Sequence, residues 1–138
     1  MSDEDEQEEP KTGLVFVDPD EKSRHAAESL EESLARSILA VDASEFDPAN
    51  SEEIQRAAAF VVCWDLGFRT GEDLLESIRA NESIRESKVL ISMDEPTRTR
   101  VLLAMELGAD AVCRRPYDAE ELAVRLEKLG LPRPAASE

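Results

Sequence analysis

The chain has 138 residues, of which 41% are hydrophobic and 35% charged, a balance that predicts one globular domain rather than two domains or a disordered chain. Its formal net charge of −16 argues against binding to nucleic-acid phosphates, and no apolar run is long enough to cross a membrane. The acidic start lacks the basic and apolar regions of a signal peptide, and two cysteines do not make a disulfide framework, so we expect a cytoplasmic protein.

Residues 1–12 carry six acidic residues without hydrophobic periodicity, which predicts a flexible acidic tail. Short apolar runs in the following segment predict five strands, at residues 13–17, 40–41, 59–64, 88–93 and 111–114. Helical periodicity predicts five helices: at residues 22–39, at residues 51–58, in the segment after Gly71 that contains Leu74, Leu75 and Ile78, from Pro96 to the residue before Gly108, and after Asp118. We expect Asp20 to cap the first helix, and residues 131–138 to form a second tail.

Strands that alternate with helices five times predict a mostly parallel sheet with helices on both faces. The strands are apolar without alternation, as expected of strands that are buried on both sides. Sites in such doubly wound α/β folds lie at the carboxyl ends of the strands. The residues at those ends are Asp18, Cys63, Met93 and Arg115.

Two local motifs and one spacing pattern carry a family resemblance. The first motif is the apolar run of residues 60–64 followed by the helix of residues 71–79, and the second is the Gly-Ala-Asp of residues 108–110 followed by the Arg-Pro-Tyr of residues 115–117. The four strand-end residues are separated by 45, 30 and 22 positions. Over residues 13–130 the chain resembles the receiver domains of bacterial response regulators, which implies a flavodoxin-like, five-stranded parallel sheet of order 2-1-3-4-5.

The resemblance also implies a phosphorylation pocket, and this chain departs from its pattern. An active receiver is expected to carry an acidic pair, an aspartate that accepts the phosphoryl group, a Ser or Thr, and a Lys before Pro. The corresponding positions here read Asp18-Pro19 with Asp20 following, Cys63, Met93 and Arg115. A thiol cannot form an acyl phosphate, and a lone carboxylate is a poor Mg²⁺ site because Mg²⁺ prefers several oxygen ligands. We therefore expect a degenerate pocket that needs no cofactor.

From these departures we expect a pseudo-receiver, which is not an enzyme and binds partner proteins without being phosphorylated. The resemblance implies that the fourth helix, fifth strand and fifth helix form the partner surface, with Met105, Val112, Tyr117 and Leu122 on it. The partner would be another signalling protein or a second copy of the chain, with no nucleic acid and no membrane involved. No output domain is expected after the last helix.

Two alternative functions stay open. In the first, Asp65 is the phosphoacceptor, and Asp18, Asp20 and Asp65 bind Mg²⁺ weakly; residues two apart on a strand share a face, so Asp65 is able to replace Cys63. In the second, Cys63 is a thiol-based sensor whose thiolate is favoured by Arg115. For Cys113, in the middle of a strand, we expect only a core position.

Overall fold

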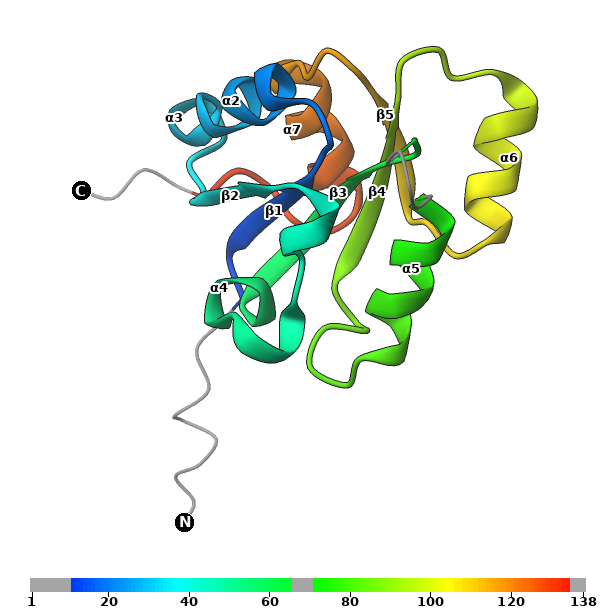
Figure 1. Cartoon of the computed structure of the whole chain (residues 1–138). Helices are drawn as coiled ribbons and strands as arrows, with labels where there is room; N and C mark the ends of the chain where they lie inside the picture. Colours follow the sequence, from blue (N-terminus) through cyan, green and yellow to red (C-terminus); the bar gives the residue numbers. More distant parts are fainter. Residues whose placement is uncertain (1–10, 66–70, 135–138) are drawn as a thin grey trace.

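The protein is described by a computed structural model, which defines residues 11–65 and 71–134 (Figure 1). Five parallel strands form one sheet in the order β2-β1-β3-β4-β5. Their bounds are Gly13–Val17 for β1, Ile38–Val41 for β2, Ala57–Cys63 for β3, Lys88–Met93 for β4 and Ala111–Arg114 for β5. This confirms the predicted doubly wound, flavodoxin-like sheet of order 2-1-3-4-5.

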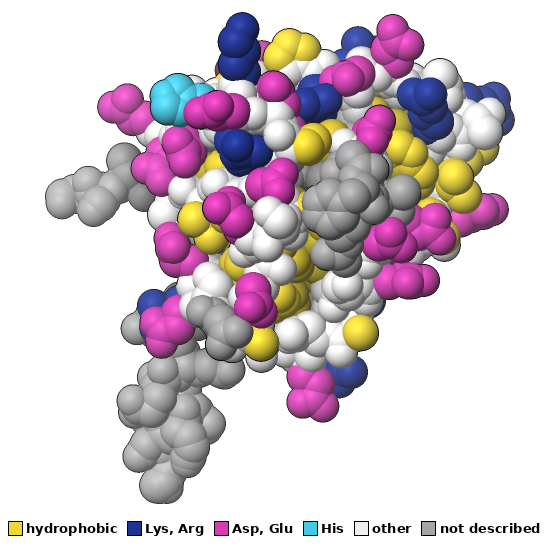
Figure 2. Space-filling view, viewed as in Figure 1, with side chains coloured by type: hydrophobic (Ala, Val, Ile, Leu, Met, Phe, Trp, Pro, Cys, Tyr) yellow, Lys and Arg dark blue, Asp and Glu magenta, His cyan; other side chains and the backbone are white. Residues whose placement is uncertain are grey.

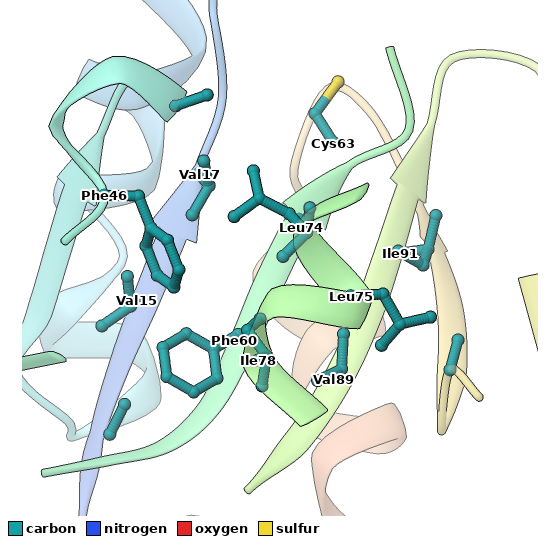
Figure 3. Packing of buried hydrophobic residues seen from close by; sticks show 14 of the residues in the cluster. Val15, Val17, Phe46, Phe60, Cys63, Leu74, Leu75, Ile78, Val89 and Ile91 are labelled. Carbon is teal, nitrogen blue, oxygen red and sulfur yellow. The ribbon is translucent and has the colours of Figure 1, made fainter. Parts of the chain in front are cut away.

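Helices cover both faces of the sheet. Their bounds are Glu21–Glu28 for α2, Glu31–Leu34 for α3, Glu52–Gln55 for α4, Gly71–Ala80 for α5, Arg98–Glu106 for α6 and Ala119–Lys128 for α7, with short 3₁₀ turns at Ala43–Glu45 and Pro48–Asn50. One core cluster packs α4, α5 and α6 against the sheet, and the other packs α2, α3 and α7 against the opposite face. In Figure 3, Leu74, Leu75 and Ile78 of α5 lie over Phe60 and Val89 of the sheet.

The helix predicted over residues 22–39 is wrong in its second half. Helix α2 ends at Glu28, and a single further turn, α3, ends at Leu34. The next residue, Ala35, has a φ of 56° and cannot continue a right-handed helix. Residues from Ile38 onward instead pair with β1, and the Ile38 N–H donates to the carboxylate of Glu31. Strand pairing in the sheet therefore overrides the helical pattern of this segment.

Two other predicted boundaries also move. Helix α4 ends at Gln55, because Ala57 already pairs with Gly13 as the start of β3. Thr97 is the N-cap of α6, so Pro96 precedes that helix instead of lying in its first turn. The predictions for β1, β4 and β5 are confirmed, as is the cap of α2 by Asp20, whose carboxylate accepts the Ser23 N–H.

Residues close to both predicted tails belong to the folded body. Leu131, the first residue of the predicted tail 131–138, is partly buried and packs on the core cluster that contains α7. The Arg36 guanidinium donates to the Thr12 and Pro132 carbonyls and thereby joins the two ends of the described chain. The acidic segment 1–10 lies outside the described residues, and its predicted flexibility stays a prediction. None of the helices within residues 11–65 and 71–134 is both long and apolar enough to cross a membrane.

Candidate functional site

The site at the carboxyl edge of the sheet is organised around Asp18, which follows β1. Its side chain is fully buried, and Arg115 donates to both carboxylate oxygens, from Nε to Oδ2 at 2.9 Å and from Nη2 to Oδ1 at 3.0 Å. Such a bidentate contact between an arginine and a carboxylate is among the strongest hydrogen-bonded ion pairs in proteins. Asp18 and Arg115, brought together as predicted, therefore form an internal ion pair.

Tyr117 completes the coordination of the buried carboxylate. Its hydroxyl donates to Asp18 Oδ2 at 2.7 Å and lies 3.1 Å from the Ser92 hydroxyl, while the Asp20 N–H donates to Asp18 Oδ1 at 2.9 Å. The Tyr117 ring packs edge-on against Phe16. Burial, together with the Asp18 charge, raises the pKa of the Tyr117 phenol well above its usual value, so the hydroxyl stays protonated as a donor. Tyr117 was expected at the partner surface, but its hydroxyl points into the pocket.

Arg115 uses its remaining donors on neighbouring elements. Its Nη1 donates to Asp94 Oδ1 at 2.6 Å, and Nη2 also donates to the Ser23 hydroxyl at 3.1 Å. Burial is the largest single influence and lowers the pKa of this guanidinium. The hydrogen bonds to Asp18, together with the negative charges of Asp18 and Asp94 and the nearby Cys63, act in the opposite direction and leave the pKa above its ordinary value. With only 13% of its side chain exposed, Arg115 is a fixed structural cation that links β5, β1, α2 and the end of β4.

Cys63 is the last residue of β3 and occupies the strand end, where receiver domains are expected to carry the phosphoacceptor. Its side chain is 2% exposed, and the thiol donates to the Asp65 carbonyl at 3.3 Å. Burial, with a further contribution from the Asp18 carboxylate, raises the pKa of this thiol, although Arg115 acts in the opposite direction. Arg115 thus favours the Cys63 thiolate in the predicted direction, but burial and the Asp18 carboxylate outweigh it, and the pKa of the thiol is raised overall. Cys113 is free and buried in the core as expected.

The other predicted pocket residues differ in position. Met93 ends β4 and is buried, so it fills space beside Cys63. Asp65 lies beyond the end of β3 and is exposed, yet it lines the same pocket as Cys63, Met93 and Arg115. Asp20 is engaged as the cap of α2, where a hydrogen bond from the Ser23 hydroxyl lowers its pKa.

These residues do not fit a Mg²⁺ ion, which needs several free oxygen ligands in octahedral geometry. Both oxygens of Asp18 already accept hydrogen bonds from Arg115, and Cys63 and Met93 offer sulfur. Within residues 11–65 and 71–134, no three His, Cys, Asp or Glu side chains lie close enough together to hold a metal ion. The charge of Asp18 is therefore compensated by the protein's own guanidinium and not by a metal ion.

Sequence reasoning missed four partners in this network: Ser23, Ser92, Asp94 and the hydroxyl of Tyr117. Ser92 and Asp94 flank Met93, and Tyr117 lies two residues after Arg115, so all were close to predicted positions. Side chains alternate along a strand, so Ser92 faces the side of the sheet opposite to Met93, where the Tyr117 hydroxyl meets both Ser92 and Asp18.

A second candidate site is the surface formed by α6, β5 and α7. Met105 is 42% exposed and Val112 is partly buried, and both line a groove there; their role in partner contacts stays a prediction. Leu122 is only 1% exposed and belongs to the core under α7, so its prediction as a contact residue is wrong. In Figure 2, acidic side chains are spread over the visible face, and apolar side chains gather on the right, where α6 lies in Figure 1.

Comparison with known proteins finds relatives of one kind. The chain is 30% identical over 69 residues to the chemotaxis protein CheY of Pseudomonas aeruginosa, a match that covers 50% of this chain and 56% of that protein. It is 32% identical over 71 residues to CheY-3 of Vibrio cholerae, covering 51% of this chain and 55% of that protein. The chain thus spans about half the length of the curated relatives it matches. No protein-family model matches the sequence.

Solved structures of receiver-type response regulators share the fold. The bacteriophytochrome response regulator AtBRR superposes with a TM-score of 0.74 at 15% identity, over 95% of this chain and all of that one. The BeF₃-activated DrrB receiver domain gives 0.69 at 20% identity, over 85% and 95% of the two chains. CheY4 of Vibrio cholerae gives 0.73 at 13% identity, over 85% and 97%. At these identities the likeness establishes the fold and leaves the function of this chain to its own residues.

Proposed function

We propose that the chain is a receiver-type domain of response-regulator signalling that works by binding partner proteins and not by phosphotransfer. The observation that carries this proposal is the saturated carboxylate of Asp18, which is buried and accepts donors from Arg115, Tyr117 and the Asp20 backbone. A carboxylate whose oxygens all accept hydrogen bonds has no free position for a metal ion. Phosphotransfer at the neighbouring strand end requires a bound metal ion.

The chemistry at the end of β3 supports the same conclusion. Cys63 stands where an acyl phosphate would form, and its buried thiol has a raised pKa, so it is a poor nucleophile. Met93, at the end of β4, has no hydroxyl or amide that would bind a phosphoryl group. Neither side chain performs the role that its position implies.

The network around Asp18 also makes an external trigger unnecessary. Through Arg115, Tyr117 and Ser92, it connects the end of β1 to the ends of β4 and β5 with hydrogen bonds internal to the chain. A switch to a second arrangement of these strand ends would break the buried ion pair between Asp18 and Arg115, which costs several kcal/mol. We infer one stable conformation, in which the face of α6, β5 and α7 is permanently presented to another signalling protein or to a second copy.

The proposal is tested by treating the protein with acetyl phosphate, and separately with beryllium fluoride and Mg²⁺. We expect no increase in mass and no chemical-shift change near Cys63, Asp65 and Arg115. The control is the double variant Cys63→Asp with Arg115→Lys, which restores an acid and a compact cation and is expected to gain a Mg²⁺-dependent response. A saturable response of the natural chain at Mg²⁺ concentrations where this variant responds would refute the proposal.

One observation favours a second candidate, an active receiver phosphorylated at Asp65. The Asp65 side chain is exposed and lines the same pocket as Arg115 and Cys63, so a phosphoryl donor is able to reach it. A mass increase of the natural chain that disappears in Asp65→Asn would support this function. The same increase in both proteins would place the modification elsewhere.

A further inference from the structure

A groove runs between α6 and α7, and its floor is the edge strand β5. It has a volume of about 470 Å³ and is open to solvent along one side. Residues from three elements line it: Pro96, Val101 and Met105, then Asp110, Ala111, Val112, Cys113 and Arg114, and finally Glu121, Arg125, Lys128 and Leu129. Five consecutive residues of this lining come from the edge strand and the residue before it, so backbone as well as side chains borders the groove.

The hydrogen bonds at the end of β5 show which backbone groups face outward. The Arg115 N–H donates to the Met93 carbonyl of β4, whereas the Arg114 N–H points away from β4 and donates to the Glu121 carboxylate at 3.2 Å. Backbone groups alternate along a strand, so the N–H and C=O of Val112 also lie on the outer edge. Within the described part of the chain β5 pairs only with β4, which leaves this edge without a neighbouring strand.

The charge of the groove differs from that of the whole chain. Three cations, Arg114, Arg125 and Lys128, line it in a protein of net charge −16. Its two carboxylates already have partners: Asp110 accepts from Arg79 and from the Val89 N–H, and Glu121 accepts from the Arg114 N–H and lies 3.7 Å from Arg125 Nη2. The cationic side chains therefore exceed the acceptors that the groove supplies.

Arg125 gives an independent indication of a missing acceptor. Among the residues that the structure describes, its Nε is a buried side-chain nitrogen without a hydrogen-bond partner. Buried donors are nearly always satisfied, and an unpaired one in a native structure requires an explanation. A carbonyl or carboxylate oxygen in the groove would supply an acceptor to this partly exposed guanidinium after a small rotation of its side chain.

We propose that this groove binds an extended, acidic segment of a partner protein, which adds to the sheet as a sixth strand beside β5. The segment pairs its backbone with the N–H and C=O of Val112. Its apolar side chains contact Val101, Met105 and Leu129, and its carboxylates approach Arg125 and Lys128. The inference rests on the proposed function and specifies the partner's chemistry.

The test uses a short fluorescent peptide that alternates glutamate with valine, titrated into the intact chain by anisotropy. We expect saturable binding, together with slower amide exchange at Val112 in NMR spectra. Replacing glutamate by lysine in the peptide is expected to abolish binding. Arg125→Met is expected to weaken binding about tenfold, because a charge-assisted hydrogen bond is lost. Arg85→Met, at an exposed arginine away from the groove, is the matched control and is expected to bind the peptide as the natural chain does.

A second pair of probes separates strand addition from simple charge attraction without altering the protein. The same peptide is methylated on every second backbone nitrogen, in both registers, so that one register lacks the N–H groups that would face β5. We expect one of the two methylated peptides to bind the protein about tenfold more weakly than the parent peptide, or weaker still. Absence of binding by the parent peptide, or equal affinity for all three peptides, would overturn the inference.

The inference and the proposed function fail independently. If the natural chain does not respond to beryllium fluoride and does not bind the peptide, the chain remains a phosphorylation-independent module whose partner has a different chemistry. If it binds the peptide only after beryllium fluoride and Mg²⁺ are added, the groove is correctly assigned and the proposed function is wrong.

Discussion

Two arginines in this protein have opposite environments. Arg115 in the strand-end pocket is 13% exposed and makes four hydrogen bonds to Asp18, Asp94 and Ser23. Arg125 in the groove is 42% exposed, lies 3.7 Å from one carboxylate, and has an unpaired Nε. The pocket therefore satisfies its buried charges from within the chain, whereas the groove contains a guanidinium nitrogen that has no acceptor among the described residues.

The largest expected loss of stability follows from removing the guanidinium that pairs with Asp18. Arg115→Met removes the partner of a fully buried carboxylate, and we expect the free energy of unfolding to fall by about 3–5 kcal/mol. Urea denaturation followed by circular dichroism measures it. In combination with Asp18→Asn the loss is expected to be smaller than the sum of the two single losses, because the charges are coupled. A loss below about 1 kcal/mol for Arg115→Met would mean that water already solvates Asp18.

The reactivity of Cys63 gives the next largest effect. A buried thiol with a raised pKa has little thiolate at neutral pH, so alkylation by iodoacetamide is expected to be about a hundredfold slower in the folded chain than in urea. The measurement is made in Cys113→Ala, which leaves one thiol. Equal rates in folded and unfolded protein would instead support the thiol-sensor hypothesis.

Tyr117 is expected to have an intermediate effect that depends on pH. Tyr117→Phe removes a hydrogen bond to a buried charge and is expected to cost about 1.5–3 kcal/mol near neutral pH. The folded chain holds the phenolic proton to a higher pH than the unfolded chain, whose tyrosine titrates near about 10. The free energy of unfolding should therefore fall as pH rises above about 10, and this fall should be smaller in Tyr117→Phe. Urea denaturation at a series of pH values measures both free energies. An equal fall with pH in the natural chain and in Tyr117→Phe would contradict the role of the Tyr117 hydroxyl.

The smallest effect is expected in the groove. Arg125→Met is the same substitution as in the pocket, but at a partly exposed side chain with one long ion pair, so stability should change by only about 0.5 kcal/mol. Urea denaturation beside Arg115→Met checks it directly. A loss comparable to that of Arg115→Met would remove the contrast between the two regions and show that Arg125 is structural.

The strands were predicted well because the buried strands are apolar without interruption, whereas their order in the sheet was implied by the family resemblance. Prediction from the sequence failed where two patterns overlap: the periodicity of residues 22–39 continues into the segment that pairs with β1, and only the sheet decides which structure forms. Leu122 was misassigned for a similar reason, because position on a helix alone does not tell which face the sheet covers.

The site was predicted in its positions but not in its contacts. Asp18, Cys63, Met93 and Arg115 meet at the strand ends because parallel strands end at one edge. Arg115 forms a bidentate contact with Asp18, and the Tyr117 hydroxyl also reaches Asp18. Both contacts depend on the side-chain directions after β5, which the spacing of residues in the sequence does not predict.

The ion pair between Asp18 and Arg115 has a consequence for how the sequence can change over time. Each residue is buried against the other, so replacing either one alone leaves an uncompensated charge and a destabilised protein. A single substitution at either position therefore does not yield a stable pocket of different chemistry, and two codons must change together. Substitution of the partly exposed Arg125 is expected to be tolerated much more easily, because its one ion pair is long and solvated.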